Sequence, residues 1–281
     1  MVDRLLATMV KYVPKGRLTS LGHFSASRPW ARKVLLALSN RLMRGPQPIP
    51  YGAGRGLMFQ NAGSQIGYSL GTTEPLVQDA LTHHLRAGMV VYDLGCNVGF
   101  FAVIMARLVG SNGRVVAFDP LPAHIEACAH NARLNALENV TTVTAAVGAV
   151  SEMREFQITR LATASHLARE GAARPLEYVR SEMVRVMTID EYVYDQGNQP
   201  PDFIKMDVEG EEINAIEGMR KTLNEYRPTL LCEVHGQSKQ MADALAELGY
   251  TATVLESNTP LKDAPWGVHI IAMPTAPAHG R

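Results

Sequence analysis

The chain has 281 residues, of which 46% are hydrophobic and 19% are charged, and its 27 basic residues balance its 27 acidic ones. This composition predicts a soluble enzyme with one large domain and an appendage. No apolar run approaches the ~20 residues of a membrane-spanning helix, which argues against an integral membrane protein, and the three cysteines show no metal-binding spacing.

Positive charge is concentrated at the start of the chain. Residues 1–50 hold nine basic residues and one acidic residue, so the remainder carries a net charge of −8. Apolar residues at helical spacing from Trp30 to Leu42 predict an amphipathic helix with a basic outer face. We therefore expect a basic helical N-terminal extension over residues 1–50 and a main domain over residues 51–281.

The role of this extension stays open between docking on the main domain, covering a substrate, binding an anionic ligand and forming a homodimer. The basic residues are not interleaved with aromatic ones, so nucleic acid is not an expected partner. The N-terminus lacks a signal-peptide pattern, which predicts a cytoplasmic protein.

From Leu57 onward the chain alternates between strand and helix patterns. Strands are expected at residues 89–94, 114–119, 140–145, 154–158, 202–207, 229–235, 251–255 and 268–273, and helices at 73–85, 99–109, 122–136, 211–226 and 239–248. The stretch 148–187 is otherwise irregular, and residues 160–175 have the composition of a loop. The fold class is therefore α/β, with a seven-stranded, mostly parallel sheet that ends in an antiparallel hairpin.

A glycine turn follows the first of these strands. It reads Asp93-Leu-Gly-Cys-Asn-Val-Gly99, and the next strand ends on Asp119. A strand, a glycine turn, a helix, a second strand and an acidic residue together form the arrangement that binds an adenosine-containing cofactor. The carboxylate of Asp119 can accept hydrogen bonds from ribose hydroxyls. Ala145 and Ala146, at the end of the third strand, would lie beside the adenine ring.

Two residues of the turn indicate which cofactor it binds. A dinucleotide-binding turn reads G-x-G-x-x-G, and its central glycine lets a diphosphate approach the backbone. Here Asn97 replaces the close-approach glycine, and Asp93 would repel a diphosphate but attract an ammonium and a sulfonium group. The pattern favours S-adenosylmethionine over a nicotinamide cofactor.

Charged side chains gather where the strands predicted at residues 202–207 and 229–235 end. Lys205, Asp207 and Glu209 occupy alternate positions and share one side of an extended chain. Glu233 and His235 do the same after the following strand. Because unpaired buried charges are costly, these side chains must face a ligand, a metal or one another.

Three interpretations of this group stay open. In the first, His235 or a carboxylate is a general base that removes the proton of an acceptor hydroxyl. In the second, Asp207, Glu233 and His235 bind a divalent cation such as Mg²⁺, which orients the hydroxyl. In the third, Lys205 pairs with Glu209 or Glu233 and holds the loops in place.

Several motifs between Gly71 and His235 belong to one pattern. They are Asp93–Gly99, Val116–Pro120, Asn131 with Asn135, Thr188–Asp190, Ile204–Glu212 and Arg227–His235. Together they resemble the FkbM family of S-adenosylmethionine-dependent methyltransferases, and the Lys-x-Asp-x-Glu-Gly block is the most specific of them. Cys96 stands where alanine is common in that family, and Asp119 where glutamate is common.

The resemblance implies a class I methyltransferase fold of the Rossmann-like type. It also implies O-methylation of a hydroxyl on a natural product, sugar or lipid, although some members esterify carboxylates. The donor-binding residues that follow from the turn and the resemblance are Glu74, Asp93, Gly95, Cys96, Asn97, Gly99, Asp119, Pro120, Ala145 and Ala146. Substrate choice would lie in the first fifty and the last forty residues, which the resemblance does not cover.

The expected function is thus that of an S-adenosylmethionine-dependent O-methyltransferase in natural product biosynthesis, with a small-molecule acceptor. A nicotinamide-dependent oxidoreductase is an alternative from another class, which requires Asn97 to tolerate a diphosphate. A non-catalytic binding module, which uses the basic N-terminal helix to contact an anionic partner, is another.

Overall fold

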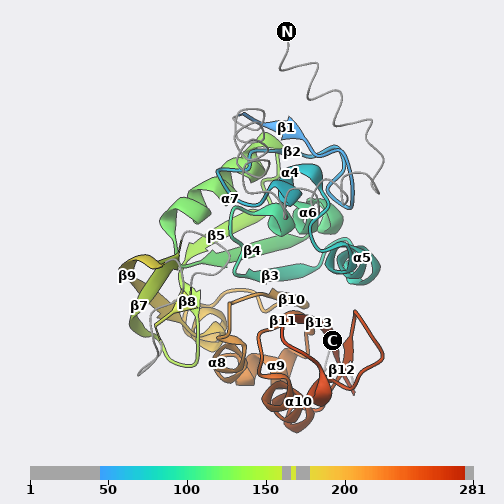
Figure 1. Cartoon of the computed structure of the whole chain (residues 1–281), viewed down its shortest axis with the longest axis vertical. Helices are drawn as coiled ribbons and strands as arrows, with labels where there is room; N and C mark the ends of the chain where they lie inside the picture. The colour runs from blue at the N-terminus through green and yellow to red at the C-terminus, as the bar shows by residue number, and fades with distance from the viewer. Residues whose placement is uncertain (1–44, 160–165, 169–177, 276–281) are drawn as a thin grey trace, which may run out of the picture. The chain divides into compact units, whose positions relative to one another are not determined.

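The structure is a computed structural model that describes residues 45–159, 166–168 and 178–275 (Figure 1). The helical extension predicted for residues 1–50 therefore falls almost wholly outside the described residues. The chain divides into two compact units, one ending at Thr73 and the other beginning at Glu74. Within the described ranges, no helix combines the length and the apolar character needed to cross a bilayer.

The described part of the first unit is small. Strands β1 (Gln47–Pro48) and β2 (Met58–Phe59) form an antiparallel pair. Helix α4 (Ile66–Leu70) ends at Gly71, whose φ is +69°. A side chain at Gly71 would overlap the carbonyl oxygen of Tyr51, so this helix end requires glycine.

The second unit contains a seven-stranded sheet with the order β12-β13-β11-β10-β3-β4-β5. Its strands are β3 (Val90–Leu94), β4 (Arg114–Asp119), β5 (Val140–Thr144), β10 (Phe203–Met206), β11 (Thr229–Val234), β12 (Tyr250–Val254) and β13 (Val268–Pro274). All pairs are parallel except those of β13, which is antiparallel to both β11 and β12. This order is that of the class I methyltransferase fold and confirms the predicted fold class.

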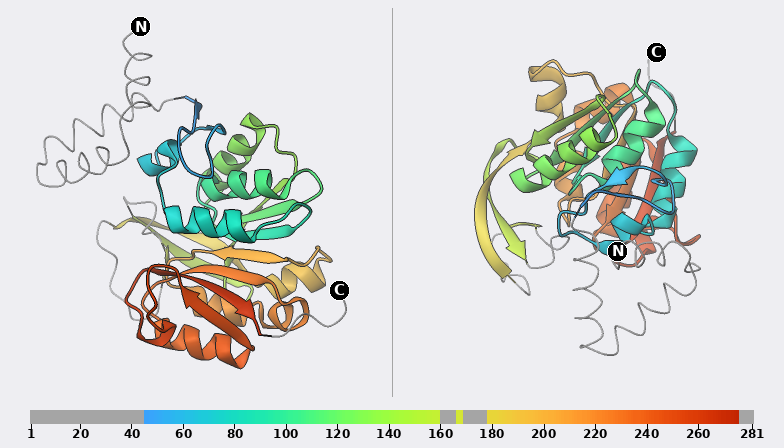
Figure 2. Two further views of the ribbon diagram at one scale, coloured as in Figure 1. Left: turned by 90° about the vertical axis from the view of Figure 1, so that its right-hand side faces the viewer. Right: turned by 90° about the horizontal axis from the view of Figure 1, so that it is seen from above.

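Helices cover both faces of this sheet (Figures 1 and 2). One face carries α5 (Pro75–His84), α6 (Phe100–Val109) and α7 (Pro122–Leu134), and the other carries α8 (Glu212–Glu217), α9 (Arg220–Tyr226) and α10 (Ser238–Glu247). Every residue of β3 is buried, which explains why the strand reads as an unbroken apolar run up to Asp93. Two short helical turns, η2 (Glu191–Asp195) and η3 (Leu261–Asp263), complete the unit.

A second sheet of four strands was largely missed by the sequence prediction. Its order is β6-β9-β7-β8, with β6 (Ala146–Val147), β7 (Glu152–Thr159), β8 (His166–Leu167) and β9 (Tyr178–Met187). Only the strand at 154–158 was predicted. The end of β9 alternates buried Val184 and Val186 with exposed Arg185, a strand pattern that its many charges obscure. Most of the loop predicted at 160–175 lies outside the described residues.

The single helix predicted at residues 211–226 is also wrong, because two helices, α8 and α9, occupy this range. The carboxylate of Asp190 accepts hydrogen bonds from the backbone N–H groups of Lys221 and Thr222, at 3.0 and 2.8 Å. These are free N–H groups of a helix start, so Asp190 stabilises a new helix at this point. Gly218, just before it, donates its own N–H to Asn214 and closes the first helix.

Candidate active site

The glycine turn, residues Gly95–Gly99, connects β3 to α6 through three left-handed residues. The φ angles are +82° at Gly95, +49° at Asn97 and +84° at Gly99. A Cβ at Gly95 would overlap the carbonyl oxygen of Asp207, and one at Gly99 would lie 2.6 Å from Sγ of Cys128. The predicted glycines are therefore required by conformation and by close packing, and Asn97 is one of the residue types that tolerate this conformation.

Asp93 brings a negative charge to the start of this turn. Its side chain is fully buried, and neither oxygen has a hydrogen-bond partner among the described residues. The nearest cation is Nζ of Lys205, 3.6 Å away. Burial raises the pKa of Asp93 to about 6. The carboxylate at the end of β3 can therefore still accept hydrogen bonds from a cationic group of a ligand.

Asp119, at the end of β4, is held in place by the chain itself. One oxygen accepts the backbone N–H of Asn97 at 3.0 Å, and the other accepts that of Leu121 at 2.9 Å. The ring of His124, which the sequence prediction missed, lies with Nδ1 3.0 Å from the second oxygen. Each carboxylate oxygen has two acceptor sites, so this arrangement orients Asp119 and leaves capacity for ribose hydroxyls. Pro120 follows directly.

The small residues predicted beside the adenine lie where β5 passes into β6. Ala145 and Ala146 are both buried there, and Cys96 is buried within the glycine turn. Their position at the strand ends agrees with the expected placement. A contact with the donor stays a prediction.

Lys205 links the turn to the loop that follows β10. Its Nζ lies 3.6 Å from Asp93 and 3.8 Å from Asp207, and 5.2 Å from the ring centre of Phe101. The pairing expected with Glu209 or Glu233 is not among the described ion pairs of Lys205. Burial raises the pKa of Asp207 to about 6, although Lys205 opposes this shift.

His235 is the centre of a group of carboxylates beyond the ends of β10 and β11. Its Nδ1 lies 2.9 Å from the fully buried Glu212, and its Nε2 lies 3.4 Å from Glu233 and 3.5 Å from Glu209. Burial alone would lower the pKa of His235, but hydrogen bonding to Glu212 and Glu233 raises it to about 11. A ring that stays protonated at neutral pH orients carboxylates and is not a free base.

Glu209 has the properties of a base more clearly than His235 does. Burial and the nearby charge of Asp207 raise the pKa of Glu209 to about 8, so a fraction of Glu209 is ionised near neutral pH and that fraction is a stronger base than an ordinary carboxylate. Its backbone is left-handed, with φ +51°, although it is not glycine. Such strain is concentrated at functional sites. In contrast, His235 and His269 hold the pKa of Glu233 well below its usual range despite its burial.

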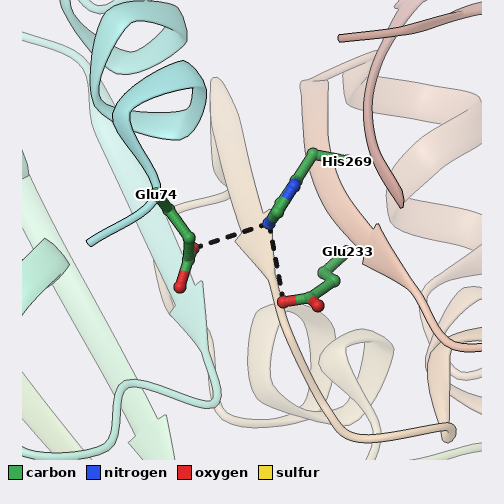
Figure 3. A group of neighbouring side chains, drawn as sticks. All are labelled: Glu74, Glu233 and His269. Carbon is green, nitrogen blue, oxygen red and sulfur yellow. Dashed lines mark ion pairs between the residues drawn. The ribbon is translucent and has the colours of Figure 1, made fainter. Parts of the chain in front are cut away.

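A second histidine, His269, was not singled out from the sequence. It lies directly opposite Glu233 in the antiparallel pair of β11 and β13. Its Nε2 is 3.5 Å from Glu233 and 3.6 Å from Glu74 (Figure 3). Its Nδ1 is 2.6 Å from Glu256. Only the register of the closing hairpin, which local patterns do not fix, could have predicted this group.

The predicted cofactor-side residue Glu74 thus points toward His269 (Figure 3). Two groups within the described ranges have the geometry to hold a metal ion: Asp207–Glu233–His235, the predicted set, and Glu74–Glu233–His269. Trp266 packs edge-on against the ring of His235, with 5.2 Å between ring centres, and is 71% exposed. It forms an aromatic surface beside the carboxylates.

Comparisons with known proteins place this geometry in context. The family model "Methyltransferase FkbM domain" matches residues 93–252. The Caenorhabditis elegans "Protein-L-isoaspartate O-methyltransferase" is 34% identical over 79 residues, which cover 27% of this chain and 35% of that protein. The chain therefore matches about a third of that relative's length.

Two solved structures are similar in fold at low identity. A methyltransferase FkbM from Methylobacillus flagellatus KT has 16% identity and a TM-score of 0.47, covering 86% of this chain and 59% of that one. An S-adenosylmethionine-dependent O-methyltransferase from Thermotoga maritima has 15% identity and a TM-score of 0.43, covering 73% and 66%.

Proposed function

The chain belongs to the methyltransferase FkbM family, and on that premise we propose that it transfers the methyl group of S-adenosylmethionine to a hydroxyl oxygen of a small-molecule acceptor. The donor would lie across the glycine turn and Asp119. The acceptor would lie beyond the ends of β10 and β11, beside Glu209 and His235.

The observation that supports this proposal most is the state of Asp93. A fully buried carboxylate without a hydrogen bond from any described residue favours a ligand that brings positive charge. S-adenosylmethionine carries an ammonium and a sulfonium group, whereas the diphosphate of a nicotinamide cofactor would be repelled. Asp119, already oriented by Asn97 and Leu121, supplies the acceptors for ribose hydroxyls.

The charge of the acceptor side favours a hydroxyl over a carboxylate. Asp207, Glu209, Glu212 and Glu233 outnumber the cationic Lys205 and His235 in the ion pairs there, so a further carboxylate entering as the acceptor would meet net repulsion. We therefore place carboxylate esterification second. The name of the Caenorhabditis elegans relative refers to isoaspartate, whose acceptor oxygen is that of a carboxylate, and so supports this second candidate. Natural products, sugars and lipids all offer acceptor hydroxyls.

In this proposal the acceptor oxygen attacks the methyl carbon, and the bond from that carbon to sulfur breaks with its electron pair staying on sulfur. The acceptor proton passes to the carboxylate of Glu209, and S-adenosylhomocysteine is the other product. Positioning of the oxygen in a dry site would supply about 7–11 kcal/mol of the barrier reduction. The base would add a factor of about 10²–10⁴.

Calorimetry with S-adenosylhomocysteine and with NAD tests the donor. We expect heat of binding with the first and none with the second, and the reverse result would overturn the assignment. A panel of hydroxyl and carboxylate acceptors with methyl-labelled donor then tests the acceptor. A methyl ester releases labelled methanol in mild alkali and a methyl ether does not, so alkali treatment separates the two products.

A further inference from the structure

The ring of His269 is held in place through its Nδ1, although its other nitrogen, Nε2, makes no hydrogen bond with a described residue. Glu256 accepts the backbone N–H of His269 at 3.1 Å and also lies 2.6 Å from its Nδ1. The ring is therefore fixed, and its Nε2 points toward Glu74 and Glu233 (Figure 3). This Nε2 is buried and makes no hydrogen bond with a described residue.

The distances from Nε2 of His269 to the two carboxylates are those of ion pairs and are longer than ordinary hydrogen bonds. Nε2 of His269 lies 3.6 Å from Glu74 and 3.5 Å from Glu233, whereas N–H···O bonds span about 2.7–3.2 Å. Zinc binds nitrogen and oxygen ligands at about 2.0–2.2 Å, which places two ligands of one tetrahedral ion roughly 3.4 Å apart. The two distances from Nε2 are close to this spacing, and the candidate ligand atoms of all three side chains lie within 4.8 Å of one another, so they can share one ion.

The backbone of Glu74 is a second, independent observation. Glu74 is the N-cap of α5, yet its φ of +44° and ψ of 64° are left-handed and its side chain makes no capping hydrogen bond. Glutamate is not a preferred N-cap residue, and the left-handed conformation is unfavourable for it, as for most residues other than glycine, asparagine and aspartate. Helix capping does not explain this conformation, and the carboxylate of Glu74 points toward His269 instead (Figure 3).

We propose that Glu74, Glu233 and His269 bind one divalent first-row ion such as Zn²⁺, and that Glu256 orients the histidine. A histidine that binds a metal through one nitrogen commonly donates the other N–H to a carboxylate, as His269 can to Glu256. One imidazole among three ligands favours this class of ion over Mg²⁺ or Ca²⁺, which prefer oxygen.

The neighbouring group Asp207–Glu233–His235 is the weaker candidate for the same ion. Nζ of Lys205 lies 3.8 Å from Asp207, and its positive charge would repel a cation there. The ion would act in methyl transfer as a Lewis acid that lowers the pKa of an acceptor hydroxyl, and this role rests on the proposed function. Binding of the ion at this site does not depend on the proposed function.

Competition between the tag-free full chain and a zinc-binding fluorophore tests the site without donor or acceptor. We expect one Zn²⁺ per chain and at least tenfold weaker binding in each of His269→Ala and Glu74→Gln. Glu256→Gln should weaken binding by about 10–100-fold, as for other residues that orient a ligand. Asp207→Asn and His124→Ala are matched controls, and both should bind Zn²⁺ as the wild type does. Asp207 is a carboxylate of the neighbouring group, and His124 is a histidine paired with Asp119.

The absorption spectrum of the Co²⁺-loaded wild type gives a second readout that does not depend on the folding of any variant. Bands of a four- or five-coordinate ion with nitrogen ligation support the site, and the spectrum of hydrated Co²⁺ overturns it. Unchanged Zn²⁺ affinity in a folded His269→Ala protein also overturns it, as does weaker binding in Asp207→Asn alone. If Zn²⁺ binds at this site but no acceptor is methylated, the site stands and the proposed function fails.

Discussion

Gly95 lies against the backbone carbonyl oxygen of Asp207, and a Cβ at position 95 would overlap that oxygen. Gly95 follows β3 and Asp207 follows β10, two strands that pair in parallel. The turn assigned to the donor and the loop that carries the acceptor-side carboxylates are therefore in direct backbone contact. A shift of one loop displaces the other.

Gly95→Ala should lower both the free energy of unfolding and the affinity for S-adenosylhomocysteine. Gly88→Ala is its matched control, because Gly88 has a similar φ of +88° but nothing within 4 Å of an added Cβ. The control should cost only the left-handed conformation, about 1–2 kcal/mol, and leave donor affinity unchanged. Urea unfolding and calorimetry measure both quantities. Equal losses in the two variants would contradict the role of the contact with Asp207.

The pKa of Asp93 predicts a pH dependence of donor binding. Burial raises this pKa to about 6, so Asp93 is ionised above that pH and neutral below it. If the ionised form binds the donor's ammonium group, affinity for S-adenosylhomocysteine should fall about tenfold between pH 7 and pH 5. Asp93→Asn should bind weakly at both pH values. Asp202→Asn, a carboxylate that accepts the N–H of Val90 at the opposite end of β3, should keep the wild-type dependence.

The sequence was sufficient to predict the strands of the sheet and the glycine turn, because both follow from local patterns. Apolar runs that end in Asp93 and Asp119 indicate buried parallel strands, and the turn between them needs glycines because its backbone is left-handed. It did not predict β9, whose alternation is masked by charged residues on its exposed side. Nor did it predict the break before α9, because the cause is a side chain, Asp190, that lies thirty residues upstream.

The same distinction separates the predicted from the missed site residues. Asp207, Glu209, Glu233 and His235 follow strands directly, so their common position could be inferred from spacing. His269 and Glu256 belong to the closing hairpin, and they reach the site only because β13 pairs with β11. Strand order is a long-range property that residue spacing does not encode.

Glu209→Gln tests the base directly. We expect kcat to fall by about 10²–10⁴ with donor affinity unchanged, because in the proposed function Glu209 faces the acceptor and not the donor. Glu138→Gln, which alters an exposed carboxylate, should leave both unchanged. His235→Ala should also lower kcat, since its ring orients Glu209 and Glu233. Asp119→Ala should weaken donor binding first. Equal losses of donor affinity in the Asp119 and His235 variants would refute this division of roles.

Asp190→Ala tests a structural role for the Thr188–Asp190 motif. The carboxylate accepts three hydrogen bonds at the start of α9, two from backbone N–H groups and one from the hydroxyl of Thr222. Its loss should lower the free energy of unfolding by about 1–2 kcal/mol without changing the affinity for S-adenosylhomocysteine. Asp195→Ala, an exposed acidic residue in the same segment, should change stability by less than about 0.5 kcal/mol. A loss of donor affinity in Asp190→Ala would show that the motif acts on the site.

Trp266 should determine acceptor binding, because it lies outside the residues matched by the family model and is exposed beside His235. An aromatic surface next to a row of carboxylates suits the apolar face of a sugar or another ring that presents a hydroxyl. Trp266→Ala should raise the KM for the acceptor several-fold while kcat and donor affinity change little. Trp266→Phe keeps an aromatic ring, so its KM should lie between those of the wild type and Trp266→Ala. Met183→Ala removes another exposed apolar side chain, on β9, and should leave KM unchanged. Steady-state kinetics with the acceptor found in the panel measure these constants, and an unchanged KM in Trp266→Ala would place the acceptor elsewhere.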